Sequence, residues 1–547
     1  MKKFLIIIII FLVGLAAAGF WAFKFAQENP GSVVETALQL VKDRPELITQ
    51  DALVQGELPV FVDILQKIFV TDGVVRRYLV LMQNNMELRP GGGFLGQYAI
   101  VEIKDAQILS WEIADANHLD RDLVSDTLAP EPIAQWLDIP KLEFRDSNWA
   151  FDFPTNAKLA QHLHNLGPNP KDFDGVMAFN ANILEDLLEV TGPIVVPGYE
   201  KQGQFTPEDV LIQLQDVVER PYLLAEMRDK CKKREEETGI EEECNTDPET
   251  GEKIKKVSHA DRENRKDILP ILTTEISKKL FGTSQMPLKE RLDLAKASIT
   301  SLIGIGVVNL DDRDIQMWFD DAALQEIAQS NNWSTIVDTL WDGDYVAVVD
   351  ANLGALKSDY YIQRSLEYTV DFTGSNAQVN DVAAGRMVRY RDQAIGSQVL
   401  AGSYKTDLPL ATMKMSYAHT AQEANYRTSD YHAYTRLYVP QGSVWKVREW
   451  FGVPDAVENV YGNKQYYGYK FDIFIGDTLP TMLQYTLPPK ITEDGYALKI
   501  QKQSGVQVLP TIVKIIDSEG QTYETSFELT RDAIVRLEGG QLVVEKL

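Results

Sequence analysis

The stretch at residues 78–96 reads YLVLMQNNMELRPGGGFLG and joins two predicted strands through a polar, glycine-rich loop. Its first five residues, 78–82, are continuously apolar, which is typical of a strand buried on both faces of a sheet. The residues at 94–103 predict a second strand directly after the loop. A strand covered on both faces needs helices above and below it, so this stretch indicates a layered α/β fold.

Strands and helices continue to alternate after this stretch. Strands are predicted at 107–113, 174–179, 305–309 and 345–349, and helices at 154–166, 183–190, 264–281, 287–303 and 321–330. This alternation predicts a mixed-sheet α/β sandwich over residues 73–359. Residues 230–265 are charged and poor in apolar side chains, so we expect them to form an exposed insertion in this domain.

The periodicity changes at about residue 360. Segments such as 433–439 and 496–500 alternate in polarity, are rich in aromatic residues and are separated by Gly, Pro, Asn and Asp. This pattern predicts an all-β, sandwich-like region over 360–547. At the other end of the α/β domain, residues 28–72 carry helical patterns, which we interpret as a helical stalk.

The N-terminus predicts a membrane anchor. Lys2 and Lys3 precede an apolar run from residue 4 to 23, which is long enough to cross a ~30 Å hydrocarbon core as a helix. Lysines stay on the cytoplasmic side, so a single-pass helix within 1–27 places the rest of the chain outside the cell. A signal peptide cleaved near the small residues at 16–18 is the alternative, and it leads to the same side of the membrane.

The charge of the chain excludes one class of partner. Its net charge is −26, so nucleic-acid phosphates are repelled and no nucleic-acid binding is expected. An anionic ligand would need a local cluster of Arg or Lys, or a divalent cation such as Mg²⁺. Metalloprotease, phosphate-binding P-loop, EF-hand and serine-hydrolase motifs are absent from the sequence, which excludes the simplest enzyme assignments.

The two cysteines of the chain, Cys231 and Cys244, lie in the charged insertion. An oxidising compartment outside the cell favours a disulfide that closes a short loop. Two unpaired thiols are the alternative.

The loop after the first strand is the main candidate for a binding site. It offers amides, a carboxylate, a guanidinium and bare backbone at Asn84, Asn85, Glu87, Arg89, Gly91, Gly92 and Gly93. Successive glycines let the backbone approach a ligand, and arginine has a planar fork that suits phosphate or carboxylate. A polar hairpin with solvated charges is the alternative interpretation.

A second loop repeats the same order of residue types after the predicted strand at 345–349. Its polar candidates are Asp350, Asn352, Lys357 and Asp359. If both strands lie in one sheet, the two loops line one rim. The alternative is that Asn352 and Gly354 only shape a turn into the β region.

The loop sequence resembles a known bacterial family. Residues 83–96 are similar to the signature of the family of proteins of unknown function numbered four thousand and twelve. The similarity extends through 174–176, 191–193, 350–361 and 501–505. The resemblance implies a membrane-anchored surface protein and no particular activity.

A remoter resemblance is to the LytR–CpsA–Psr transferases, which move glycopolymers from a polyprenyl-pyrophosphate carrier to peptidoglycan. Residues 173–179, 187–196 and 206–211 resemble segments of their α/β fold, and 261–265 resembles their arginine-bearing helix. The resemblance implies that Arg262 and Arg265 bind pyrophosphate. Two departures stand out: Gly96-Gln97-Tyr98 replaces an Arg-Ser-Asp motif, and residues 110–115 keep an acid, Asp115, but lose an arginine.

These observations lead to two hypotheses. In the first, the chain binds or transfers a lipid-pyrophosphate-linked glycopolymer at the outer face of the membrane. Arg89 would join Arg262 and Arg265 around the anion, and Asp115 would hold Mg²⁺ against the phosphates. In the second, it is a non-catalytic surface module that binds envelope glycan, such as peptidoglycan, or a protein partner.

The aromatic residues of the β region favour a role in binding glycan or protein partners, although packing between strands explains them equally. They include Tyr360, Tyr361, Tyr431, Tyr434, Tyr438, Tyr466, Tyr467 and Tyr469.

Overall fold

The computed structural model describes a large part of the chain from residue 38 onward. It leaves out residues 1–37, 40–41, 48–51, 240–242, 248–249, 255–267, 284, 355, 375–387, 391–392, 396–406, 448–457 and 460–461. The apolar run at 4–23 therefore lies outside the described residues. Among the residues that are described, no helix combines the length and the apolar character needed to cross a membrane.

The first domain is built on a five-stranded mixed sheet in the order β3-β2-β1-β4-β7. Its central strand, β1, is parallel to β4, and the other neighbouring pairs are antiparallel. The strands are β1 (Arg76–Arg89), β2 (Gly92–Lys104), β3 (Gln107–Asp115), β4 (Gly175–Asn180) and β7 (Ile315–Phe319). The mixed α/β sheet expected from the sequence is thus present.

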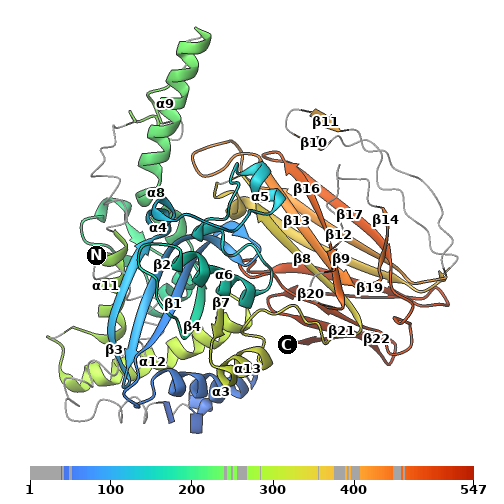
Figure 1. Ribbon diagram of the computed structural model, residues 1–547, viewed down its shortest axis with the longest axis horizontal. Coiled ribbons are helices and arrows are strands. Elements are labelled where there is room, and N and C mark those ends of the chain that lie inside the picture. Colours follow the sequence, from blue (N-terminus) through green and yellow to red (C-terminus); the bar gives the residue numbers. More distant parts are fainter. Residues whose placement is uncertain are drawn as a thin grey trace.

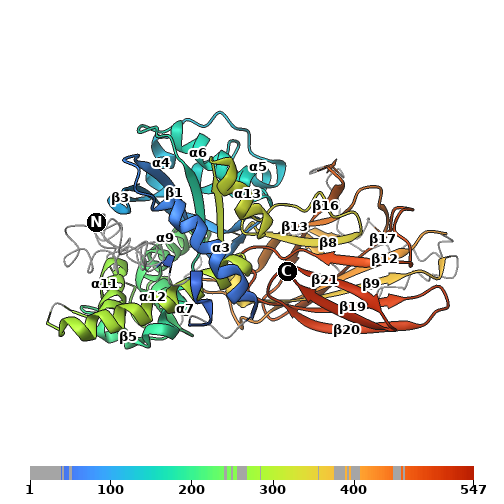
Figure 2. The same ribbon diagram turned by 90° about the horizontal axis from the view of Figure 1, so that it is seen from below.

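Helices cover both faces of this sheet (Figures 1 and 2). One face carries α4 (Ala116–Asp122), α5 (Glu131–Trp136), η2 (Phe144–Asp146) and α6 (Phe153–Asn165). The other carries α3 (Ala52–Ile68), α7 (Ile183–Thr191), α8 (Val210–Val218), α11 (Ile268–Phe281), α12 (Leu288–Asp311) and α13 (Ala322–Ser330). A small ribbon of β5 (Ile194–Val195) and β6 (Gln204–Phe205) and the turns η1 (Pro45–Leu47) and η3 (Glu200–Gln202) complete the domain.

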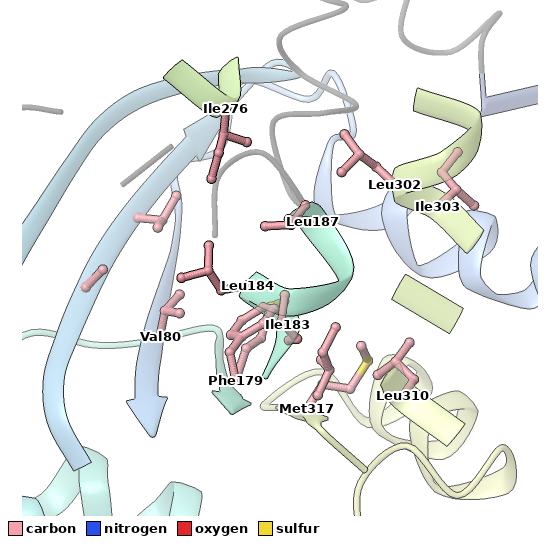
Figure 3. Packing of buried hydrophobic residues seen from close by; sticks show 14 of the residues in the cluster. Val80, Phe179, Ile183, Leu184, Leu187, Ile276, Leu302, Ile303, Leu310 and Met317 are labelled. Carbon is pink, nitrogen blue, oxygen red and sulfur yellow. The ribbon is translucent and has the colours of Figure 1, made fainter. Parts of the chain in front are cut away.

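The alternation of side-chain direction along β1 explains why helices cover both faces of the sheet. Leu79 and Leu81 belong to the core under α6, whereas Tyr78 and Val80 belong to the core on the opposite face. Figure 3 shows Val80 near Phe179 of β4, with side chains from α7, α11 and α12 around them. Successive strand residues point to opposite faces, so a continuous apolar run fills two cores at once.

The predicted stalk differs from the structure. Helix α3 packs against the body of the α/β domain instead of extending away from it. Its residues Leu58, Phe61 and Leu65 are at most 1% exposed, and the Phe61 ring meets Trp333 edge-on at 6.1 Å between centroids. An apolar helix face of this kind is stable only when covered, and the α/β domain supplies the cover.

The second domain is a β sandwich of two sheets. The six-stranded sheet contains, in spatial order, β14 (Val444–Val447), β17 (Thr478–Thr486), β12 (Leu410–His419), β9 (Ile362–Asp371), β19 (Leu509–Ile516) and β20 (Thr522–Leu529). The seven-stranded sheet contains β15 (Glu458–Asn459), β16 (Lys464–Ile473), β13 (Tyr431–Pro440), β8 (Asp344–Asn352), β18 (Ala497–Ile500), β21 (Ala533–Glu538) and β22 (Gln541–Lys546). A hairpin of β10 (Val388–Tyr390) and β11 (Gln393–Ile395) stands apart.

The boundary between the domains lies earlier than the sequence indicated. Strand β8 pairs with β13 and β18 inside the sandwich, although its residues fall within the predicted α/β span of 73–359. Its apolar run does not distinguish the two environments, because a strand buried on both faces looks the same in either domain. The tyrosines at 431, 434, 438, 467 and 469 are at most 3% exposed, so strand packing accounts for them.

The charged insertion begins with α9 (Arg220–Thr238), which projects away from both domains in Figure 1. Cys231 of this helix and Cys244 are joined in a disulfide with Cα atoms 5.5 Å apart. The bond ties the outer half of the helix to the segment that returns along it.

Buried ionic contacts hold the two domains together. The guanidinium of Arg313, which follows α12, donates to the carboxylate of Asp532 at 2.5 Å and to the carbonyl of Lys502 at 2.8 Å. The side chains of Arg313 and Asp532 are both fully buried. Asp532 also accepts from the backbone N–H of Lys502 at 2.9 Å. This desolvated ion pair therefore links the α/β domain to the sandwich.

We predict that Arg313→Met lowers the free energy of unfolding by about 3–5 kcal/mol, because it leaves the carboxylate of Asp532 buried without its cation. Guanidinium denaturation followed by tryptophan fluorescence measures this. The matched control is Arg536→Met, which removes a partly exposed pair with Glu545 and should cost only ~0–1 kcal/mol. Equal losses in the two variants would contradict the role given to Arg313.

Candidate functional site

The loop singled out in the sequence is a wide bulge at the end of β1. Asn84 pairs with Phe94 and Leu88 pairs with Gly93, so residues 85–87 have no partners in β2. A bulge bends its strand and redirects side chains. Here it carries the end of β1 against the sandwich, where Asn85 Nδ2 donates to the carbonyl of Gly505 at 3.2 Å.

The three glycines serve packing at this junction. A Cβ on Gly91 would lie 2.3 Å from the Asn156 amide nitrogen, and one on Gly92 would lie 2.1 Å from Gln83 Oε1. A Cβ on Gly93 would lie 2.2 Å from the backbone carbon of Asn84. The backbone of this loop is therefore surrounded by protein atoms, and the space predicted for a ligand is filled by the chain itself.

Arg89 is also committed to the protein. Its guanidinium donates to Glu87 Oε1 at 2.9 Å and to the carbonyl of Asn352 at 2.7 Å. Glu87 forms a second ion pair with Lys357, and both Glu87 and Arg89 are 3% exposed. Burial alone would raise the pKa of Glu87, but Lys357 and Arg89 outweigh it and hold that pKa below its usual value. The contacts of Arg89 differ from its predicted anion-binding role, because its N–H donors already face acceptors of the chain.

The second predicted loop meets the first one. The backbone N–H of Leu88 donates to Asp359 Oδ2 at 2.8 Å, and Asn352 Nδ2 donates to the same oxygen at 2.9 Å. Asp359 and Asp350 also accept from the guanidinium of Arg364, at 2.5 and 2.8 Å. The structure thus brings the two loops together at one rim, as a closed polar network between the domains.

A third segment, 501–505, completes this network. Gln503 Nε2 donates to the carbonyls of Arg89 and Asp350 at 3.1 and 2.8 Å. Ser504 Oγ donates to the carbonyl of Arg313 at 2.6 Å and accepts from Gln316 at 3.0 Å. Three of the segments that resemble the bacterial family, 83–96, 350–361 and 501–505, therefore converge on the junction between the domains.

An open site lies beside this junction. A cavity of about 280 Å³, which we call the apolar chamber, lies at the carboxyl ends of the parallel strands β1 and β4. Ligands of open α/β sheets bind outside the carboxyl ends of the strands. Apolar side chains from three helices form much of its wall: Ile183 and Leu184 of α7, Leu211, Leu214 and Val218 of α8, and Leu269 of α11.

Buried amides line the mouth of the apolar chamber. Gln83 and Asn180 face each other across the β1–β4 ladder, and Gln215 of α8 also lines the cavity. Within the described residues, neither polar atom of the Gln83 side chain has a hydrogen-bond partner, nor do Asn180 Oδ1 and Gln215 Nε2. All three residues are at most 5% exposed. An unpaired buried polar group costs about 1–3 kcal/mol, so these amides mark a site for a ligand.

Most of the residues that line this chamber were not identified from the sequence. Gln83 was included in the loop as a polar residue without a role, and Gln215 of α8 was not singled out. A signal was present in α8, where a glutamine stands on the buried face between Leu211 and Val218. An uncharged amide at such a position is unusual in a helix core.

Of the remaining predicted residues, Asp115 is not among those that line the chamber. Asp115 ends β3 and caps α4, where its carboxylate accepts from the backbone N–H of Asn117 at 3.0 Å. In the part of the chain that the structure describes, no group of three or more His, Cys, Asp or Glu side chains could hold a metal ion. Arg262 and Arg265 lie outside the described residues.

We predict that Gly93→Ala destabilises the protein by about 1–3 kcal/mol, because the new methyl group overlaps the backbone of the bulge. The matched control is Gly96→Ala in the same strand, where the nearest atom to the new Cβ lies 3.6 Å away. Thermal unfolding of the two variants measures the difference. If Gly93→Ala melts at the temperature of the parent protein, the packing role of the loop is wrong.

The comparisons with known proteins support the α/β domain alone. Residues 72–216 match the model of a family described as "Protein of unknown function (DUF4012)", and no curated protein matches the chain. Among solved structures, the chain is similar to the Lin1025 protein from Listeria innocua, with 12% identity, coverage of 48% of this chain and 78% of that chain, and a TM-score of 0.21. The matched residues extend from just before β1 into α8 and include the bulge and most of the apolar chamber. Over residues 72–216 this chain is therefore similar to the DUF4012 family.

Proposed function

We propose that this chain is a membrane-anchored protein of the bacterial cell envelope that binds a lipid-linked envelope glycan through the apolar chamber. The apolar run at 4–23 supports the anchor and the extracytoplasmic location. The observation that carries the binding role is the chamber itself, an apolar cavity with unpaired buried amides at its mouth. Such a cavity suits an apolar chain that ends in a polar head.

Binding is favoured over transfer by what the candidate catalytic groups do. Arg89 is held by Glu87 and the carbonyl of Asn352, and Asp115 is held at the N-terminus of α4. Releasing Arg89 to a substrate phosphate would leave Glu87 with only one cation in a buried site, which costs several kcal/mol. A role in which neither residue changes partner is therefore the simpler one.

The head group of the lipid has its own candidate partners. Arg262 and Arg265 shortly precede α11, and Leu269 in the first turn of that helix lines the apolar chamber. We retain both arginines as proposed contacts for a phosphate or pyrophosphate between the lipid and the glycan, because a bidentate arginine pairs well with such a group. No step of the proposal depends on a metal ion.

We predict that a photoreactive prenyl alcohol, with a diazirine in its chain, labels peptides of α7 and α8 in the full chain reconstituted in lipid nanodiscs. Ala181→Phe should reduce this labelling by about tenfold or more, because the new ring enters the chamber that Ala181 lines. The matched control is Ala323→Phe at an exposed position of α13, which should label like the parent. Labelling spread evenly over the protein surface would contradict the proposal.

The role of the arginines is tested with a second photoreactive probe, in which the same prenyl chain ends in a pyrophosphate. Labelling by prenyl pyrophosphate should saturate at a lower concentration than labelling by the alcohol, and Arg265→Ala should remove that advantage, with or without magnesium. If the alcohol and the pyrophosphate saturate alike in the parent protein, the arginines have no part in binding.

A further inference from the structure

Two more cavities continue from the apolar chamber across the junction between the domains. The first, about 620 Å³ in volume, lies between the β1 bulge and the sandwich, and we call it the interdomain groove. It shares Met86 and Leu211 with the apolar chamber. These two side chains therefore stand between the cavities, and the flexible thioether of methionine adapts readily to a neighbouring ligand.

The second cavity, about 540 Å³ in volume, lies on the outer face of the six-stranded sheet, and we call it the sheet-face groove. It shares Ser365, Ser416 and Pro510 with the interdomain groove. Ser365 and Ser416 are direct partners in the β9–β12 ladder, so the groove runs across these strands. The three cavities thus form a series in which each one borders the next.

The lining changes character along this series. Apolar helix residues surround the chamber, whereas the interdomain groove presents side chains with hydroxyl and amide groups, among them Gln363, Ser365, Ser416 and Gln507. Asn85 also lines this groove, and its buried Oδ1 has no hydrogen-bond partner within the described residues. Hydroxyl and amide groups both donate and accept, which suits a ligand that itself carries many hydroxyl groups.

The charges of the interdomain groove are balanced internally. Arg364 is held by Asp359 at 2.5 Å and by Asp350 at 2.8 Å. Burial raises the pKa of Glu185 to about 7, so near neutral pH a large fraction of this carboxyl is protonated and can donate to a ligand hydroxyl. Tyr360 lies at the edge with 47% of its surface exposed, and its ring offers an apolar face. This lining fits an uncharged saccharide better than a polyanion.

We propose that the three cavities form one extended site, in which the apolar chamber holds the lipid end and the two grooves hold several sugar units of the glycan attached to it. This inference rests on the proposed function, because the lipid end is assigned to the same chamber. It adds the chemical class of the head, a neutral, hydroxyl-rich saccharide, and it gives the sandwich domain a part in binding.

The test uses three photoreactive probes with the same prenyl chain, ending in an alcohol, in glucose or in maltose, on the full chain in nanodiscs. The concentration that half-saturates labelling of α7 and α8 should fall from the alcohol to the glucoside to the maltoside. The total gain should be about tenfold or more, which corresponds to about 1.4 kcal/mol. Ser416→Tyr and Gln363→Ala should each remove the advantage of maltose and leave the alcohol unchanged.

A matched control and two contrary outcomes make this test decisive. Val543→Tyr places the same ring on an exposed position of β22, away from the grooves, and should preserve the order of the probes. If the alcohol labels the chamber but sugars add no affinity, the extended site is overturned and the lipid-binding proposal survives. If the alcohol does not label the chamber either, both proposals fail.

Discussion

The contact on which the architecture depends is the buried carboxylate of Glu87 between Lys357 and Arg89. A carboxylate that is 3% exposed is tolerated only with cations at hydrogen-bonding distance. One cation, Arg89, comes from the same strand and the other, Lys357, comes from the sandwich domain, so Glu87 has both cations only when the domains are docked. The wide bulge of β1 is what brings Glu87 to this position, and the glycines opposite it leave room for the backbone. The domain junction, the bulge and the glycine-rich loop are therefore consequences of one electrostatic constraint.

This constraint explains why the charged residues and glycines of this loop contact protein atoms, although the loop has the composition of a ligand-binding loop. Amides, a guanidinium and bare backbone are suited to a phosphate, but they are equally suited to the carbonyls and carboxylates of another domain. The second loop and the segment at 501–505 supply those acceptors through Asn352, Asp359 and Gln503. The rigid junction then fixes the relative position of the apolar chamber in one domain and the sheet-face groove in the other.

The sequence was sufficient for the parts of the fold that depend on local pattern. The apolar run of β1, the strand β4 and the helices α6 and α7 follow from periodicity, and the aromatic alternation after residue 360 indicates the sandwich. Residues 305–309 were predicted as a strand, yet they lie within α12. Ile303, Val307 and Leu310 of that helix are buried in the core of the α/β domain, so tertiary packing outweighed propensity.

The candidate site could be predicted only in part, because its members interact across domains. The two polar loops do meet, although their strands β1 and β8 lie in different sheets and not in one sheet as the prediction of a shared rim required. The sequence could not reveal that Arg89 and Asp359 are already paired there. Helix α3 was likewise misassigned to a stalk, because only the tertiary structure shows that its apolar face packs against Trp333. The roles of these residues depend on contacts with residues far away in the sequence. A single sequence does not show which distant residues are in contact.

The buried amides that line the apolar chamber are stronger evidence for a ligand-binding site than the charged loop is. The charged groups Glu87, Arg89 and Asp359 of the junction are paired with groups of the chain itself, and their removal would lower stability. Gln83 and Gln215 are different, because they are buried like core residues and yet leave donors and acceptors open. A purely structural core would gain from leucine at such positions, since an unpaired buried amide costs about 1–3 kcal/mol. Native proteins concentrate such costs at functional sites, and here the cost falls on the lining of the apolar chamber.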